Sequence, residues 1–238
     1  MTKATRALCT MGIDEAGRGP AIGPMVVAVV CVNTTGARIL TRCGISDSKS
    51  FGAGSHARSQ RHTLAQLVHT KALHVGATVL EPRVIDERVC MNQLNHLERE
   101  TAQSLIEDAP CADQIIADGE RLFGPLTRQF KNLVARNSAE SFHVAVAAAS
   151  IIAKDLRDRL YAEICQHYEP EFGPITGGGY VNAGTRQFLR AYAGRHGGLP
   201  PEARRSWPYH YLCDILGDDF NPKAQLIDAM RHQLPLFS

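Results

Sequence analysis

Paired cysteines, long apolar runs and a strong net charge are all missing from this sequence. None of its seven cysteines forms a Cys-x-x-Cys pair, and an odd, scattered set of cysteines argues against a disulfide framework or a zinc knuckle. The longest apolar run, residues 144–153, contains a serine and is too short to span a bilayer. The opening residues lack the apolar stretch of a signal peptide. We therefore expect a cytoplasmic protein with reduced thiols and no membrane partner.

The loops that commonly cradle nucleotide phosphates are also missing. The chain has no Gly-x-x-x-x-Gly-Lys-Ser/Thr segment, and Gly17, Gly19 and Gly23 are spaced G-x-G-x-x-x-G ahead of an apolar strand. A dinucleotide-binding fingerprint requires G-x-G-x-x-G at the start of a helix. We therefore expect no nucleotide cofactor.

The overall charge excludes little by itself. The chain has 26 Lys and Arg against 24 Asp and Glu, and the net charge of +2 is too small to indicate a polyanionic partner. Its 238 residues, 44% hydrophobic and 21% charged, are typical of a globular protein with one or two domains. Residues 186–205 are locally basic and form either a patch that faces a polyanion or a solvated arginine-rich face. The charged residues of this segment are Arg186, Arg190, Arg195, Glu202, Arg204 and Arg205.

Hydrophobic periodicity predicts an α/β fold. Three strands come first and, because short connections join them, they are expected to pair antiparallel. Helical and extended segments then follow one another, which favours a mixed sheet flanked by helices. The predicted strands cover residues 8–13, 25–32, 37–44, 75–80 and 114–117, and the predicted helices cover residues 59–72, 94–107 and 141–168.

Acidic residues follow two of the predicted strands directly. Asp14 and Glu15 come after the strand at 8–13, and Asp118 ends the strand at 114–117. An acid beside apolar strand residues is costly to bury unless it binds a cation or a hydrogen-bond donor. Taken alone, Asp14 is more simply explained as an acceptor for the amides of the following turn.

A third acidic element lies on the long predicted helix, which carries Asp155 and Asp158. Ser150, Lys154 and Asp158 are four residues apart and share one side of that helix. Spacing alone does not choose between Asp155 and Asp158. Carboxylates without His or Cys suit hard cations such as Mg²⁺ or Mn²⁺, and two such ions can activate a water and stabilise a leaving oxygen in phosphoryl transfer.

Five short stretches, taken in order along the chain, form a distinctive set. The two most specific are Gly12 to Pro20 and Ala148 to Lys154, the second followed by Arg157-Asp158. The other three are Asp47-Ser48-Lys49, Ala117-Asp118-Gly119, and Gly179-Tyr180 followed by Gly184-Thr185. Together they resemble the type 2 ribonuclease H family, ribonuclease HII.

The resemblance implies a ribonuclease H-like mixed sheet flanked by helices, with a small C-terminal helical extension. Residues 1–185 would form the catalytic domain, residues 186–225 the helical extension and residues 226–238 a tail. The implied activity is hydrolysis of the RNA strand of RNA/DNA hybrids. It includes cleavage 5′ of single ribonucleotides embedded in duplex DNA, which leaves a 3′-hydroxyl. A monomer that serves ribonucleotide excision repair and DNA replication is expected.

Residue roles carried over from the family complete this expectation. Two divalent ions, Mg²⁺ or Mn²⁺, would be held by four catalytic acids, with Asp158 preferred over Asp155 because Arg157-Asp158 aligns better with the family; the four are Asp14, Glu15, Asp118 and Asp158. The backbone of Gly17-Arg18-Gly19 would meet the ribose 2′-hydroxyl, which distinguishes RNA from DNA. Lys49 would bind a phosphate, Tyr180 would stack on the sugar of the next deoxynucleotide, and the basic segment 186–205 would help to hold the duplex.

Two other classes of protein remain open at this point. Another nuclease of the same fold, such as a resolvase or an integrase, would also use a carboxylate cluster but should lack the Gly-Arg-Gly and Gly-Tyr elements. A non-catalytic nucleic-acid binding module would have no use for convergent acids, because unpaired acids repel phosphate.

The last residues resemble a short peptide that docks bacterial replication and repair proteins on the sliding clamp. Its pattern is glutamine-leucine-x-leucine-phenylalanine, here Gln233, Leu234, Leu236 and Phe237. Pro235 would stiffen the peptide and lower the entropy cost of binding. The alternative is a tail that folds back as a hydrophobic plug on its own domain.

Overall fold

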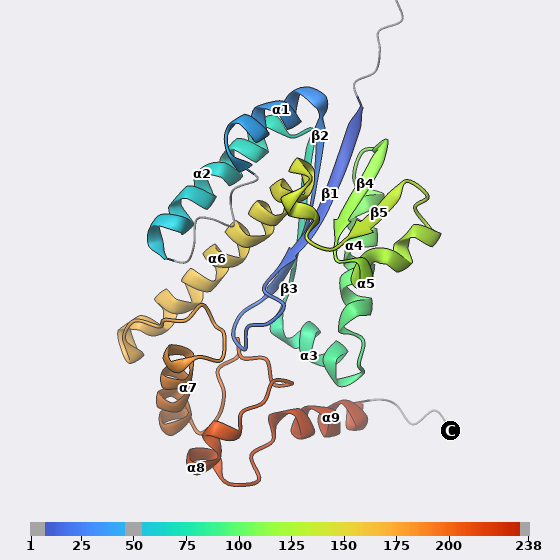
Figure 1. Ribbon diagram of the computed structural model, residues 1–238. Helices are drawn as coiled ribbons and strands as arrows, with labels where there is room; N and C mark the ends of the chain where they lie inside the picture. Colours follow the sequence, from blue (N-terminus) through green and yellow to red (C-terminus); the bar gives the residue numbers. More distant parts are fainter. Residues whose placement is uncertain (1–7, 46–53, 234–238) are drawn as a thin grey trace, which may run out of the picture. The chain divides into compact units, whose positions relative to one another are not determined.

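One mixed sheet of five strands organises the protein, in the order β3-β2-β1-β4-β5 (Figure 1). The computed structural model describes residues 8–45 and 54–233. β1 pairs antiparallel with β2 and parallel with β4, and β4 pairs parallel with β5. The strands are β1 Cys9–Ala16, β2 Met25–Asn33, β3 His74–Leu80, β4 Gln114–Asp118 and β5 Leu133–Arg136.

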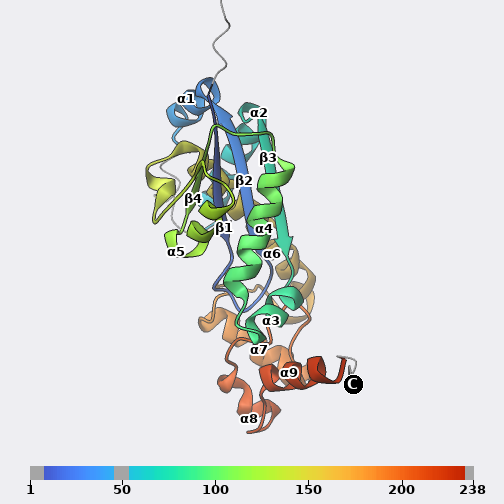
Figure 2. The same cartoon turned by 90° about the vertical axis from the view of Figure 1, so that its right-hand side faces the viewer.

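Helices cover both faces of the sheet. α1, α2 and the first half of α6 lie over one face, and α4 lies over the other (Figure 1 and Figure 2). Because both faces are covered, β2 is a continuous apolar run rather than an alternating one, and every residue from Met25 to Val32 is at most 2% exposed. These helices are α1 Thr34–Arg42, α2 Ser55–Lys71, α4 Leu94–Asp108 and α6 Val144–Phe172.

The described residues form two compact units. Within the described residues, the first comprises residues 8–16, 26–45, 54–79 and 95–158, and the second comprises residues 17–25, 80–94 and 159–233. The division of the chain at residues 185 and 225 stays a prediction. In the part of the chain that the structure describes, no helix is long and apolar enough to cross a membrane.

The second unit is built from helices around an aromatic core. Tyr161 and Tyr168 of α6 pack there with Phe188 and Leu189 of α7 and with Tyr209. The ring centroids of Tyr168 and Phe188 are 5.2 Å apart, within the usual range for aromatic pairs. The helices and short 3-10 segments outside the sheet layers are α3 Pro82–Cys90, α5 Glu120–Phe123, η2 Gly124–Arg128, η3 Ala139–Ser141, α7 Ala183–His196, η4 His210–Leu212, α8 Cys213–Leu216 and α9 Pro222–Gln233.

Most of the predicted elements are confirmed with shifted ends, but the predicted strand at 37–44 is wrong. That segment belongs to helix α1. The Asn33 side chain accepts a hydrogen bond from the Gly36 N–H at 2.8 Å and so caps the helix. β5 was not predicted, because a strand of four residues carries too little alternation to detect.

The start of α6 is pressed directly against β1. A Cβ atom at Gly12 would lie 2.1 Å from the carbonyl carbon of Ala145, so only glycine allows this approach. Residues 145–149 on the helix are small and buried, and four of the five are alanine. This contact brings the middle of α6 close to the acidic end of β1.

We expect Gly12→Ala to lower the free energy of unfolding by about 3 kcal/mol or more, the upper end of the usual cost of overpacking, because the new methyl group would meet backbone atoms. Denaturant unfolding followed by circular dichroism measures the change. Gly194→Ala in α7 is the matched control, since no atom lies within 4 Å of the place that its new methyl group would take. It should be neutral or stabilise by about 0.5–1 kcal/mol. A Gly12→Ala protein as stable as wild type would contradict the packing argument.

Candidate active site

Asp14 and Asp118 lie side by side because of the strand pairing. β1 and β4 run parallel with Ile13 opposite Ala117, so the next residue on each strand is an aspartate at the same edge of the sheet. Gly119 then turns the chain away with a φ of 102°, a backbone conformation that favours glycine. The expected convergence of acids at two strand ends is present in the structure.

Asp14 is buried, with 6% of its surface exposed. Burial raises its pKa, while a hydrogen bond from Ser150 and the charge of Lys154 oppose that rise. The Lys154 ammonium donates to the Ser150 hydroxyl over 2.7 Å, and the Glu15 N–H donates to the Asp14 carboxylate over 2.8 Å. Ser150 and Lys154 therefore share one side of α6, as predicted, and that side supports Asp14.

Glu140, which the sequence analysis missed, is a third acid in this group. Burial, a hydrogen bond with Glu140 and the charges of Asp14 and Glu140 raise the pKa of Asp118 to about 6, against a hydrogen bond from the Ala139 N–H that lowers it. Glu140 lies on η3 and is 8% exposed. Its position could not be foreseen, because it follows β5, the strand that was not predicted.

The structure does not bring Asp158 into that group. The Asp158 carboxylate pairs with Arg61 of α2 at 2.5 Å and with Arg157 at 3.6 Å. Asp155 is buried and lies 3.2 Å from His62 Nδ1. Asp155 and Asp158 therefore face α2 and help to join these two helices.

The acids of β1, β4 and η3 are close to one another but are not in a preformed metal-binding arrangement. Across residues 8–45 and 54–233, no group of three or more His, Cys, Asp or Glu side chains is already arranged to hold a metal. The chemistry of the donors nevertheless fits a hard cation, since all are carboxylates, and burial together with their mutual charge raises the pKa of Asp118. A bound cation would relieve that repulsion.

The residues predicted to contact substrate fall into two groups. Gly17, Arg18 and Gly19 form a loop in the second unit, and Gly17 has a φ of 86°. Tyr180, also in the second unit, is 51% exposed, and its Cε1 atom would lie 3.2 Å from a Cβ at Gly19. The structure therefore brings this loop and the tyrosine together. Lys49 and the tail residues Leu234, Leu236 and Phe237 lie outside the described residues, as does the side chain of Gln233.

The basic segment 186–205 is not one exposed patch. Arg204 is fully buried, so the expectation that it faces a duplex is wrong. Arg190 pairs with Asp214 at 2.5 Å, and Arg195 pairs with Glu171 at 2.7 Å. Their charges are compensated within the second unit.

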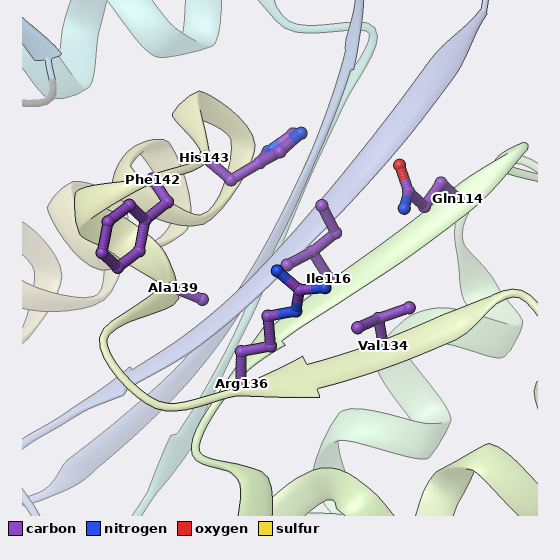
Figure 3. A pocket seen from close by; sticks show the side chains of 7 residues that line it. All are labelled: Gln114, Ile116, Val134, Arg136, Ala139, Phe142 and His143. Carbon is purple, nitrogen blue, oxygen red and sulfur yellow. The ribbon is translucent and has the colours of Figure 1, made fainter.

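A small cavity of about 230 Å³ lies beside η3 in the first unit (Figure 3). Ile116 and Val134 form an apolar floor, and Arg136 reaches over it from β5. Phe142, which is 85% exposed, comes from the segment between Glu140 and α6. The remaining lining residues are Gln114, Ala139 and His143. The sequence carried no signal for this cavity.

Comparison with known proteins assigns the family. The model of the family described as Ribonuclease HII matches residues 11–209. The chain belongs to the ribonuclease HII family. Ribonuclease HII from Thermofilum pendens is 32% identical over 212 residues, which cover 82% of this chain and 94% of that protein.

Two solved structures show the same architecture. Ribonuclease H2 from Pyrococcus horikoshii OT3 superposes with a TM-score of 0.73 at 26% identity, covering 94% of this chain and 99% of that one. Ribonuclease HII from Archaeoglobus fulgidus, solved as a PCNA:RNase HII complex, gives a TM-score of 0.70 at 29% identity, covering 85% of this chain and 96% of that one. The expected ribonuclease H-like sheet with a helical C-terminal region is confirmed.

Family membership also establishes the coarse activity. As a member of this family, the protein is an endonuclease with ribonuclease H activity on RNA/DNA hybrids, and the family depends on divalent metal ions. The alternatives of a resolvase, an integrase or a non-catalytic binding module are thereby set aside.

The raised pKa of Asp118 predicts how the stability of the metal-free enzyme varies with pH. A carboxyl whose pKa is higher in the folded chain contributes stability that is complete below the unfolded value of 3.8 and is lost as the pH rises through about 6. We expect Asp118→Asn to raise the melting temperature at neutral pH in the presence of a chelator, because Asn keeps an oxygen for the Ala139 N–H and removes the charge. The gain should vanish near pH 3.8.

Differential scanning calorimetry of both proteins across this pH range makes the comparison. Asp214→Asn serves as the control, since Arg190 lowers the pKa of Asp214 and loss of that charge should not stabilise the protein. An Asp118→Asn protein that melts at or below the wild-type temperature at neutral pH would rule out repulsion within the acid group.

Proposed function

We propose that this enzyme cuts 5′ of single ribonucleotides embedded in duplex DNA, as well as RNA in hybrids, and leaves a 3′-hydroxyl. The observation that carries the proposal is the juxtaposition of Asp14, Asp118 and Glu140 at one edge of the sheet. The loop of Gly17 to Gly19 supports the choice of substrate, because it starts two residues after Glu15 and packs against Tyr180.

Asp14, Glu15, Asp118 and Glu140 are the proposed ligands of two divalent ions, Mg²⁺ or Mn²⁺. When bound, such ions supply an activated water and stabilise the leaving oxygen of the phosphodiester. Ser150 and Lys154 oppose the rise that burial causes in the pKa of Asp14, and Ser150 orients its carboxylate. Asp158, expected from the family resemblance as the fourth acid, is better explained as the partner of Arg61, and Glu140 is proposed in its place.

Substrate selection is proposed to depend on the second unit. The backbone of Gly17-Arg18-Gly19 would contact the ribose 2′-hydroxyl, since glycine lets the backbone approach closely. The exposed ring of Tyr180 would stack on the next deoxyribose and so detect the RNA-to-DNA junction. Lys49 is retained as the proposed phosphate-binding residue.

A sliding clamp is the proposed protein partner, which would direct the enzyme to replication and ribonucleotide excision repair in the cytoplasm. The Archaeoglobus fulgidus relative was solved in complex with PCNA. In this chain the candidate peptide is Gln233 to Phe237, whose pattern matches the bacterial clamp-binding motif. Burial of apolar side chains such as Leu236 and Phe237 in such a complex would contribute favourably to the free energy of binding.

The acid assignment predicts unequal effects of neutral substitutions. Asp14→Asn, Asp118→Asn and Glu140→Gln should each lower kcat on a single-ribonucleotide duplex by about a hundredfold or more, a loss typical of one electrostatic group in an active site. Asp158→Asn should reduce kcat much less and lower the melting temperature instead, because it breaks the Arg61 pair.

Steady-state cleavage of a fluorescent duplex, together with thermal melts, separates the two effects. Asp214→Asn is the matched control, as its carboxylate pairs with Arg190 in the second unit. If Asp158→Asn abolished turnover while Glu140→Gln kept it, Asp158 would be the fourth ligand and the present assignment would fail.

The proposed stack predicts that Tyr180→Ala weakens cleavage at single ribonucleotides more than cleavage along uniform RNA/DNA hybrids. Only the first substrate presents a junction for the ring to cover. We expect a loss of about tenfold or more in kcat/KM for the first, since stacking on an aromatic ring contributes about 1–3 kcal/mol. Tyr180→Phe keeps the ring and should behave like wild type. Equal losses on both substrates would exclude the junction stack.

A further inference from the structure

A fully buried arginine holds the Gly17 to Gly19 loop. Arg204 donates from Nη2 to the Gly17 carbonyl at 2.5 Å, from Nη1 to the Arg18 carbonyl at 2.9 Å and from Nε to the Gly23 carbonyl at 3.0 Å. Its exposed surface is 0%. Only the planar fork of arginine can reach three oxygens of one loop from a single side chain.

These bonds decide which way the peptide groups of the loop face. In a trans peptide the C=O and the following N–H point in opposite directions, and the described chain contains no cis peptide. The carbonyls of Gly17 and Arg18 point at the guanidinium, so the N–H groups of Arg18 and Gly19 point away from it. Those two N–H groups therefore lie on the side of the loop opposite the guanidinium.

Neighbouring residues hold Arg204 and the loop in the same arrangement. The Trp207 indole N–H donates to the Gly19 carbonyl over 3.1 Å, and its ring lies 5.0 Å from the Arg204 guanidinium. The backbone N–H of Arg204 donates to the Ala21 carbonyl over 2.8 Å. Every carbonyl from Gly17 to Gly19 is therefore bound from the segment that contains Arg204 and Trp207.

A buried carboxylate fixes that segment in turn. Asp86 of α3, 3% exposed, accepts hydrogen bonds from the Arg205 N–H at 2.7 Å and from the Ser206 N–H at 2.9 Å. Its negative charge also attracts Arg204. A buried guanidinium needs such compensation, because an isolated buried charge is costly.

We propose that Arg204 is a positioning residue for ribonucleotide selection, which it exerts by turning the N–H groups of Arg18 and Gly19 toward the substrate. The inference rests on the proposed contact of this loop with the ribose 2′-hydroxyl. Trp207 assists by holding the Gly19 carbonyl. Because Arg204 is fully buried, its effect is exerted through the loop, on discrimination between ribose and deoxyribose.

The test compares two constants for each protein: KM for a duplex with one ribonucleotide, and the inhibition constant of the same duplex in all-DNA form as a competitor. Their ratio reports discrimination separately from kcat. Arg204→Lys keeps the charge but loses the fork, and Trp207→Phe keeps the ring but loses one hydrogen bond. We expect the ratio of the inhibition constant to KM to fall about tenfold or more in Arg204→Lys and less in Trp207→Phe, because a hydrogen bond involving a charged group contributes more than a neutral one.

Arg83→Lys, on the exposed side of α3, is the matched control and should keep the wild-type ratio. An Arg204→Lys protein that folds and loses kcat but keeps the ratio would overturn the inference. If Arg204→Lys does not fold, the test rests on Trp207→Phe. In that case an unchanged ratio of the inhibition constant to KM in Trp207→Phe would overturn the inference. A wild-type ratio near one would instead refute the proposed 2′-hydroxyl contact itself.

Discussion

Parallel pairing of β1 and β4 is the constraint on which the active site depends. Asp118 ends β4 and Asp14 lies near the end of β1, so the register that places Ile13 opposite Ala117 also brings Asp14 and Asp118 together. Burial and shared negative charge then raise the pKa of Asp118 to about 6. The fold thus holds carboxylates close together despite their repulsion, which a bound divalent cation would relieve.

The same part of α6 packs against the sheet and supports the acidic site. The helix lies so close to β1 that Gly12 has no room for a side chain. Because the helix is so close, Ser150 can hydrogen-bond to Asp14, and Lys154, one turn later on the helix, can hydrogen-bond to Ser150. A bulkier face on the helix would remove these donors from the acid, even if the strands remained paired.

The second unit holds the loop of Gly17 to Gly19 in place, although two of its three residues have no side chain. Glycine allows the chain to approach a ligand but leaves the backbone free to move. Here the carbonyls are bound by Arg204 and Trp207, and the charge of Arg204 is balanced by Asp86. The aromatic core around Tyr168 and Phe188 supports this arrangement, so what looked like an appendage in the sequence contributes directly to the loop.

Local patterns in the sequence determined the apolar strands β1 and β2, the acids near the ends of β1 and β4, and the common side of Ser150 and Lys154, because each depends on neighbours a few residues away. Asn33 shows a limit of such patterns: it lies between two predicted strands, but it caps α1. Tertiary structure alone decided the rest. Glu140 joins the acids only because the short strand β5 pairs with β4, Asp158 meets an arginine 97 residues away, and Arg204 meets Gly17 across 187 residues. Contacts between residues so far apart depend on how the whole chain packs and buries its side chains. The periodicity of hydrophobic residues within one segment does not contain that information.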